Sequence, residues 1–189
     1  SYYSHGAGFS ADIRAMDTLN FNVDARIMAR ENKDASVLDG YRNRLTVNAS
    51  YVASKTTQIQ VSSTVSTEET KTNIQNNRDY GLNISINKTF KMPLNCSFEQ
   101  PAFYCLKNLP LSAGLSFGGS FREYAGPNPT IDPDTTRNDY TFRFSPSLTI
   151  PAGETMAILL SGGLTRVDSN IPNSEYDNIS VTVGISKQF

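Results

Sequence analysis

The chain has 189 residues, of which 38% are apolar and 19% charged, and its formal net charge is -1. This composition fits one folded domain and excludes a largely disordered chain, and the near-neutral charge gives no sign of a nucleic-acid-binding surface. The single histidine, His5, excludes a histidine-rich metal site, and the chain has no run of about 18 apolar residues that would predict a transmembrane helix.

Segments in which apolar and polar residues alternate follow one another from near the start of the chain. Such a period of two is typical of a β-strand with one apolar and one polar face. Short breaks at residues 17–18 and 54–56 predict tight turns, and residues 31–40 and 67–78 form longer polar connections. The first five predicted strands cover residues 7–16, 19–30, 44–53, 58–65 and 80–87.

The second half of the chain continues the pattern, with predicted strands at residues 111–122, 140–150, 156–164 and 176–189. The connection at 125–138 contains Pro127, Pro129 and Pro133 and cannot be a central strand. Residues 151–153 predict another short turn, and a polar stretch at 168–174 leads into the last strand.

The connections alternate between short and long, with the short ones after the first, third and seventh segments. Most segments have about ten residues, close to the ~9–11 that a tilted strand needs to cross a bilayer. Outer-membrane barrels have this asymmetry, with short periplasmic turns at one end and long outer loops at the other. The longer connection at about residues 91–110 falls on the short side and would be periplasmic.

The last strand carries the most specific signal. The residues on its apolar side are Ile179, Val181, Val183, Ile185, Lys187 and Phe189. This alternation resembles the closing strand of Gram-negative outer-membrane β-barrel proteins, in which a terminal Phe after alternating apolar residues is read by the barrel-assembly machinery. The resemblance implies an all-β, transmembrane, antiparallel up-and-down β-barrel in the cell outer membrane, in contact with its lipid and lipopolysaccharide. Ile185 and Phe189 would belong to the assembly signal, and Lys187 departs from the family, which usually has an apolar or aromatic residue there.

The only two cysteines, Cys96 and Cys105, lie in the connection at 91–110. Their closeness favours a disulfide in an oxidising compartment such as the periplasm over two free thiols. A zinc site would need more ligands than this neighbourhood offers.

The composition of the polar face favours a membrane barrel over a soluble β-sandwich. This face is rich in Ser, Thr, Asn and Gly and poor in Lys and Glu, whereas the solvated face of a soluble sheet usually carries both charges. Aromatic residues gather at segment ends, as in the two aromatic girdles of membrane barrels. They are Tyr41, Tyr80, Phe121, Tyr124, Tyr140 and Tyr176 toward the long connections, and Tyr51, Phe90 and Phe189 toward the short turns.

The sequence predicts one unit over residues 1–189, which is either a single β-barrel domain or a portion of a larger barrel. With Phe189 in the periplasm, nine strands would place residue 1 outside the cell, whereas bacterial single-chain barrels have even strand numbers. Either at least one strand lies upstream and the chain is the carboxyl-terminal part of a larger barrel, or residues 18–189 form an eight-stranded barrel. We favour the first alternative because the alternation in residues 7–16 is as regular as elsewhere.

Arginine outnumbers the carboxylates on the polar face. We expect Asp12, Arg14, Asp24 and Arg26, on adjacent strands, to pair with one another. Arg42, Arg44, Arg122 and Arg143 have no carboxylate partner in their own strands and are therefore better candidates to line a lumen, although some could bind lipopolysaccharide phosphate at the outer rim.

These features predict a pore or export conduit with a basic interior lined by Ser, Thr and Asn, which would favour anions. The alternative is a closed structural barrel that anchors or displays loops for a surface or periplasmic protein partner. A third interpretation is a secreted β-sandwich adhesin, which would be soluble without detergent. We expect no enzyme and no cofactor, since His5 lies outside the predicted strands and the carboxylates form no catalytic motif.

Overall fold

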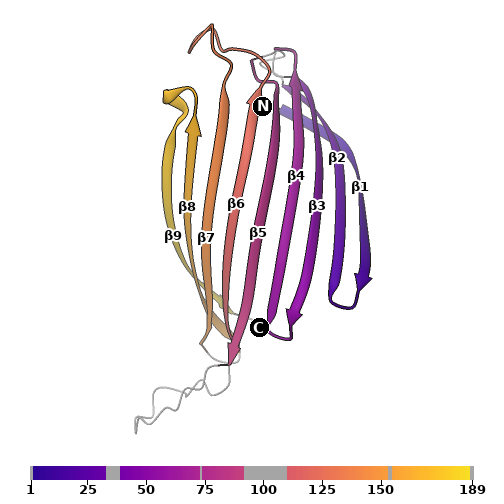
Figure 1. The fold of residues 1–189 in the computed structure, drawn as a ribbon, viewed down its shortest axis with the longest axis vertical. Coiled ribbons are helices and arrows are strands. Elements are labelled where there is room, and N and C mark those ends of the chain that lie inside the picture. The colour runs from indigo at the N-terminus through magenta and orange to yellow at the C-terminus, as the bar shows by residue number, and fades with distance from the viewer. Residues whose placement is uncertain (1, 33–38, 73, 92–109, 153–154, 188–189) are drawn as a thin grey trace.

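Nine antiparallel strands form one sheet in a computed structural model that describes residues 2–32, 39–72, 74–91, 110–152 and 155–187. The sheet order follows the chain order, so each strand pairs with the next one along the sequence. Figure 1 shows them running alternately up and down. The expected all-β, antiparallel, up-and-down fold is therefore confirmed, but the sheet is not closed into a barrel. The strands are β1 (Tyr2–Met16), β2 (Leu19–Asn32), β3 (Gly40–Ser54), β4 (Thr57–Thr70), β5 (Asn77–Lys91), β6 (Pro110–Tyr124), β7 (Asn138–Pro151), β8 (Met156–Ser169) and β9 (Tyr176–Lys187), and a 3-10 helix, η2 (Pro172–Ser174), precedes β9.

Across the described ranges, no helix has the length and apolar character needed to cross a membrane.

The strands contain 12 to 15 residues. β1 to β8 are each longer than the apolar alternation that predicted them, because main-chain pairing continues past the last apolar position, whereas β9 is described at residues 176–187 of the predicted 176–189. Glu68 still pairs with Asn77, so the connection predicted at residues 67–78 shrinks to residues 71–76. His5, outside the predicted strands, lies in β1.

The register aligns the apolar residues of all nine strands on one face. Phe117 and Phe144 are directly opposite in β6 and β7, and their ring centroids are 5.0 Å apart. The polar residues form matching rows on the other face, and a slip of one residue in any strand would exchange the two. One apolar row runs through Ile13, Phe21, Ala49, Val61, Ile84, Phe117, Phe144, Leu164 and Ile179.

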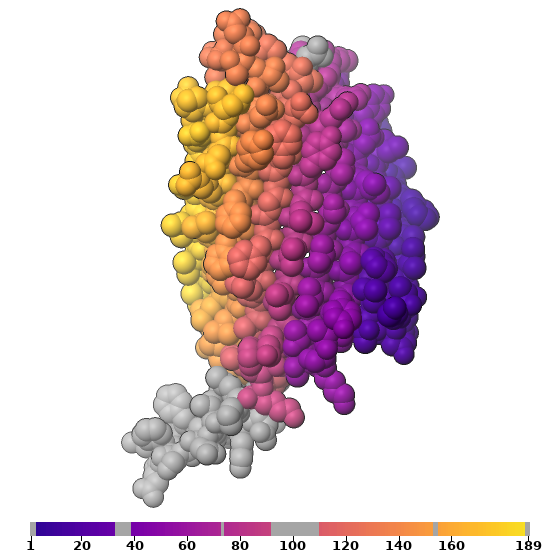
Figure 2. Space-filling view, viewed as in Figure 1, coloured from indigo at the N-terminus to yellow at the C-terminus, as the bar shows by residue number. Residues whose placement is uncertain are grey.

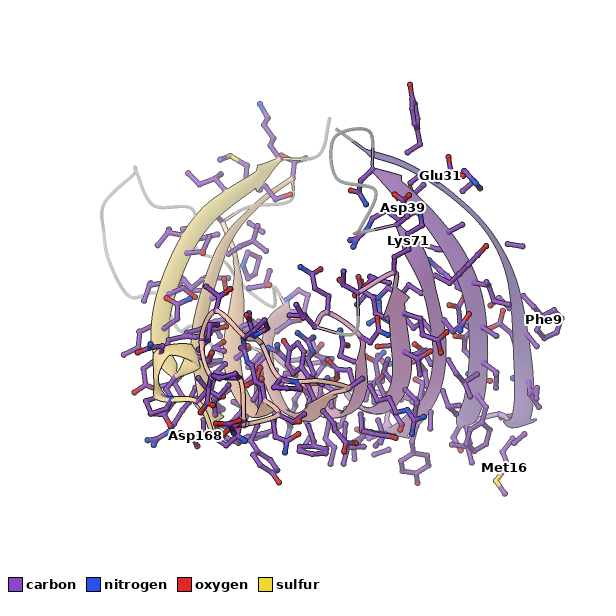
Figure 3. The ribbon with its side chains drawn as sticks, turned by 90° about the horizontal axis from the view of Figure 1, so that it is seen from above. Phe9, Met16, Glu31, Asp39, Lys71 and Asp168 are labelled. Carbon is purple, nitrogen blue, oxygen red and sulfur yellow. The ribbon has the colours of Figure 1, made fainter. Side chains whose placement is uncertain are left out.

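The sheet bends into a trough whose convex face is the apolar one. Figure 3 shows β1 and β9 at the two rims, with Phe9 and Met16 pointing outward from β1. Asp39 and Lys71 lie toward the inside, so the polar rows line the concave side. Figure 2 looks onto the convex face, which is continuous across the sheet. Twist and curvature of this kind are the normal state of a sheet with many strands.

Small residues on the concave face of β6 make room where polar side chains from both neighbouring strands converge. A Cβ at Gly114 would lie 2.5 Å from Ser147 Oγ and 2.6 Å from Asn87 Oδ1. Gly118 faces the same side, and its Cβ would lie 3.1 Å from Asn83 Oδ1. The glycines therefore provide space for neighbouring polar side chains.

The described part of the sheet has no hydrophobic core. No large side chain there is fully buried, and large apolar residues on the convex face are exposed, up to 80% for Val181. The main-chain edges of β1 and β9 have no strand partner within the described residues. A contiguous apolar surface of this extent on a soluble monomer is unusual, so the convex face needs lipid or protein to cover it.

Candidate functional site on the concave face

Polar side chains on the concave face form a hydrogen-bonded lining that crosses several strands. Asn22 donates from Nδ2 to Asp12 Oδ1 at 2.9 Å and accepts at Oδ1 from Asn48 Nδ2 at 3.1 Å. On the central strands, Ser116 Oγ donates to Asn83 Oδ1 at 2.9 Å. These contacts give hydrogen-bond partners to polar side chains on neighbouring strands, and the lining of the concave face is therefore hydrophilic.

The four charges expected to pair with one another do so only in part. Asp24 and Arg26 form an ion pair within β2, with 2.8 Å between Oδ1 and Nε. Arg14 instead pairs with Asp17 in the β1–β2 turn at 2.9 Å, and Asp12 accepts a hydrogen bond from Asn22. The expected pairing is therefore confirmed for Asp24 with Arg26 and wrong for Asp12 and Arg14, because Arg14 pairs with the carboxylate of Asp17 in the turn.

The four arginines predicted to line a lumen all occupy concave-face positions of the register. Arg122 is not free: its Nε and Nη2 donate to Asp79 Oδ2 on β5 at 2.9 and 2.6 Å. The sequence signal that would have found this partner is the polar position of Asp79 at the start of the neighbouring strand. Arg42, Arg44 and Arg143 have no ion pair within the described residues.

Positive charge concentrates where β2 and β3 approach the end of the sheet that carries the long connections. Arg26 lies directly opposite Arg44, and Arg42 lies two residues before Arg44 on β3, closer to the long connections. Arg30 pairs with Glu68 on β4, with 3.2 Å between Nη2 and Oε1. We define Arg26, Arg30, Arg42 and Arg44 as the arginine cluster.

The β6–β7 connection forms a cap that the sequence did not predict. Arg137 donates from Nε to Asp139 Oδ1 at 2.8 Å and lies over the ring of Tyr124, 5.0 Å from its centroid. Ile171, before η2, is buried beneath this connection and lines a cavity of about 280 Å³ with Ile131. The same cavity is lined by Asn77 and by Glu68, which pairs with Arg30 of the arginine cluster.

Asp39 fastens the chain at the start of β3. Its carboxylate accepts the backbone N–H of Asn32 at 2.6 Å and the ammonium of Lys71 at 2.9 Å. The backbone hydrogen bond and the hydrogen bond from Lys71 lower the pKa of Asp39 below its ordinary value of 3.8. The ends of β2, β3 and β4 are thereby held together at the rim of the arginine cluster.

Most of the aromatic residues predicted at strand ends lie on the convex face. Phe121 and Tyr140 are paired across β6 and β7 with ring centroids 4.8 Å apart, and Tyr140 is 61% exposed. Tyr124 and Tyr176 instead occupy concave positions, opposite Asn77 and Val167. Their place at a strand end was predictable, but the face depended on the exact register.

Several predicted residues lie outside the described ranges. They are Cys96 and Cys105, with most of the connection at 91–110, and Phe189 of the assembly signal. Ile185 is described, and it is 72% exposed on β9.

Within the described residues, His, Cys, Asp and Glu form no group of three or more that could hold a metal ion.

Comparison of the sequence with known protein families gives no match, and comparison with curated proteins gives no significant match. The functional argument therefore rests on the two faces of the sheet and on the charges of the concave one.

Proposed function

We propose that the nine strands form part of the wall of a Gram-negative outer-membrane β-barrel, whose concave face lines a pore or export conduit. The observation that carries the proposal is the register, which keeps apolar residues on the convex face of every strand and polar residues on the concave face. A barrel in a bilayer needs this polarity, since its outside meets lipid and its inside meets water.

The strand lengths and edges agree with this proposal. Strands of 12 to 15 residues exceed the ~9–11 needed to span the hydrocarbon layer. The edges of β1 and β9 would pair with further strands or with each other when the barrel closes, which leaves no main-chain group unsatisfied in lipid. The expected partners are outer-membrane lipid, lipopolysaccharide and the barrel-assembly machinery.

The interior would be basic and lined by Ser, Thr and Asn. Most concave carboxylates are neutralised by an arginine, as in the pairs of Asp79 with Arg122 and Asp24 with Arg26. Arg42, Arg44 and Arg143 add positive charge beyond these pairs. Fixed positive charge in a narrow aqueous passage raises the local concentration of anions.

A second function, a closed structural barrel that displays its loops, is favoured by one observation. Ile131 and Ile171 line one cavity together with Glu68 and Asn77, which occupy concave positions of β4 and β5, so the β6–β7 connection turns inward at this end of the sheet. About eight strands would leave an interior filled by side chains, whereas about sixteen would leave a channel.

Conductance of the intact protein in planar bilayers tests the proposal. A conduit gives ion currents that favour chloride over potassium in a salt gradient. Insertion without current would support the structural barrel, and cation preference would reject the basic conduit. A protein that stays folded and monodisperse without detergent would reject membrane insertion altogether.

A further inference from the structure

We infer that the arginine cluster is a binding site for phosphate-bearing anions on the concave face. This inference rests on the proposed function, since it takes the concave face to be the aqueous interior. It goes further by assigning the ligand class and the residues, in place of a general preference for anions.

The first argument is the arrangement of like charges. Arg26 and Arg44 are directly opposite on neighbouring strands, where Cβ atoms are about 5 Å apart and like charges repel. Arg42 adds a third guanidinium on the same face. The nearby carboxylates of Asp24 and Glu68 are engaged by Arg26 and Arg30, so the cluster carries excess positive charge that an anion would balance.

The second argument is space beside the charges. A cavity of about 280 Å³ lies beside the cluster, at its end nearest the long connections. Arg30 and Arg42 of the cluster line it, while Arg26 and Arg44 lie outside its lining, and the other lining residues include Ser4, Met28, Tyr41, Glu68, Glu69 and Thr70. Since a water takes about 30 Å³, the cavity has room for a phosphate group with several waters. Ser4 and Thr70 bring hydroxyl groups to the same space.

The third argument is the choice of ligand. Guanidinium groups bind phosphate oxygens through paired, charge-assisted hydrogen bonds, and several converging arginines suit a polyvalent oxyanion better than chloride. The cluster faces the trough and not the lipid-facing side, so its ligand would be a soluble phosphate-bearing solute and not a lipid headgroup.

Binding of inorganic phosphate and pyrophosphate to the intact protein in uncharged detergent tests the site by titration calorimetry at fixed ionic strength. Arg42→Gln and Arg44→Gln should each weaken pyrophosphate binding roughly tenfold, as expected for loss of a hydrogen bond between charged groups at a solvated site. Glu68→Gln should tighten binding, because it removes a competing carboxylate from the cavity.

Arg78→Gln is the matched control, since it removes the same charge at a similar height but on the opposite face of the sheet, where Arg78 pairs in register with Thr67 and Glu123. It should leave pyrophosphate binding unchanged within about twofold. Absence of binding to the unmodified protein, or equal weakening by Arg78→Gln and Arg44→Gln, would overturn the site.

The outcomes separate the site from the proposed function. Conductance without pyrophosphate binding would reject the site and keep the conduit. Pyrophosphate binding that depends on Arg44, in a protein that carries no current, would keep the site and reject the conduit. Binding to anionic phospholipid vesicles that depends on Arg44, without binding of soluble pyrophosphate, would overturn the assignment of the cluster to the aqueous interior.

Discussion

A lysine at the middle of the central strand distinguishes a lipid-facing convex face from one that meets water. Ile84 lies at the centre of β5, is 40% exposed and is flanked in its row by Val61 and Phe117. Its neighbour in sequence, Ser85, faces the concave side opposite Gln60 and Ser116. Ile84→Lys and Ser85→Lys therefore place the same charge one residue apart, on opposite faces of the same strand.

The expected costs of the two substitutions differ strongly. A lysine on the lipid face at the bilayer midplane costs about 2–4 kcal/mol, which lowers the folded-to-unfolded ratio by about 30-fold to 700-fold. Ser85→Lys stays in water and should cost less than about 1 kcal/mol. On a convex face that meets water, Ile84→Lys would also fall in the smaller range.

The assay is urea unfolding of the intact protein in phospholipid vesicles, followed by the gel mobility of unheated samples. The expected result is a large loss of stability for Ile84→Lys and little change for Ser85→Lys. Equal costs for the two variants, or a neutral Ile84→Lys, would refute the assignment of the convex face to lipid.

Three further predictions concern contacts that hold the sheet. Asp79→Asn should cost about 1–2 kcal/mol in the same unfolding assay, because the pair with Arg122 is partly buried. Asp168→Asn breaks an exposed pair with Arg166 and should cost less than about 0.5 kcal/mol, so equal losses of stability in the two variants would contradict this prediction. Gly40→Ala should cost about 1–3 kcal/mol because its Cβ would overlap the carbonyl oxygen of Glu69 on β4, and Gly119→Ala, whose Cβ would lie 3.9 Å from the nearest listed neighbour atom, Thr141 O, is the control that should stay within about 0.5 kcal/mol. Because the pKa of Asp39 is depressed in the folded protein, its contribution to stability is present above the ordinary value of 3.8 and is lost as the pH falls below it. Thermal unfolding should show this loss of stability at acid pH in the unmodified protein and a smaller loss in Asp39→Asn. Identical profiles of stability against pH would argue against a role of Asp39 in holding the start of β3.

Alternation in the sequence was sufficient to predict nine strands, their order of appearance and the face of most of their residues, with Tyr124 and Tyr176 at the strand ends as exceptions. This succeeded because a strand has a side-chain period of two and each connection is short enough to pair consecutive strands. The concave positions of Arg42, Arg44, Arg122 and Arg143 followed from the same period.

Other features depended on contacts between strands and could not be read from one strand at a time. The partner of Arg122 is Asp79 on β5, and the opposition of Arg26 and Arg44 arises only when the register of β2 and β3 is fixed. The cap likewise depends on Arg137 of the connection meeting both Asp139 on β7 and the ring of Tyr124 on β6. The sequence by itself therefore determined the two faces of the sheet, because that choice is local, whereas the tertiary structure alone decided which charges meet, because pairing depends on register and curvature summed over many strands.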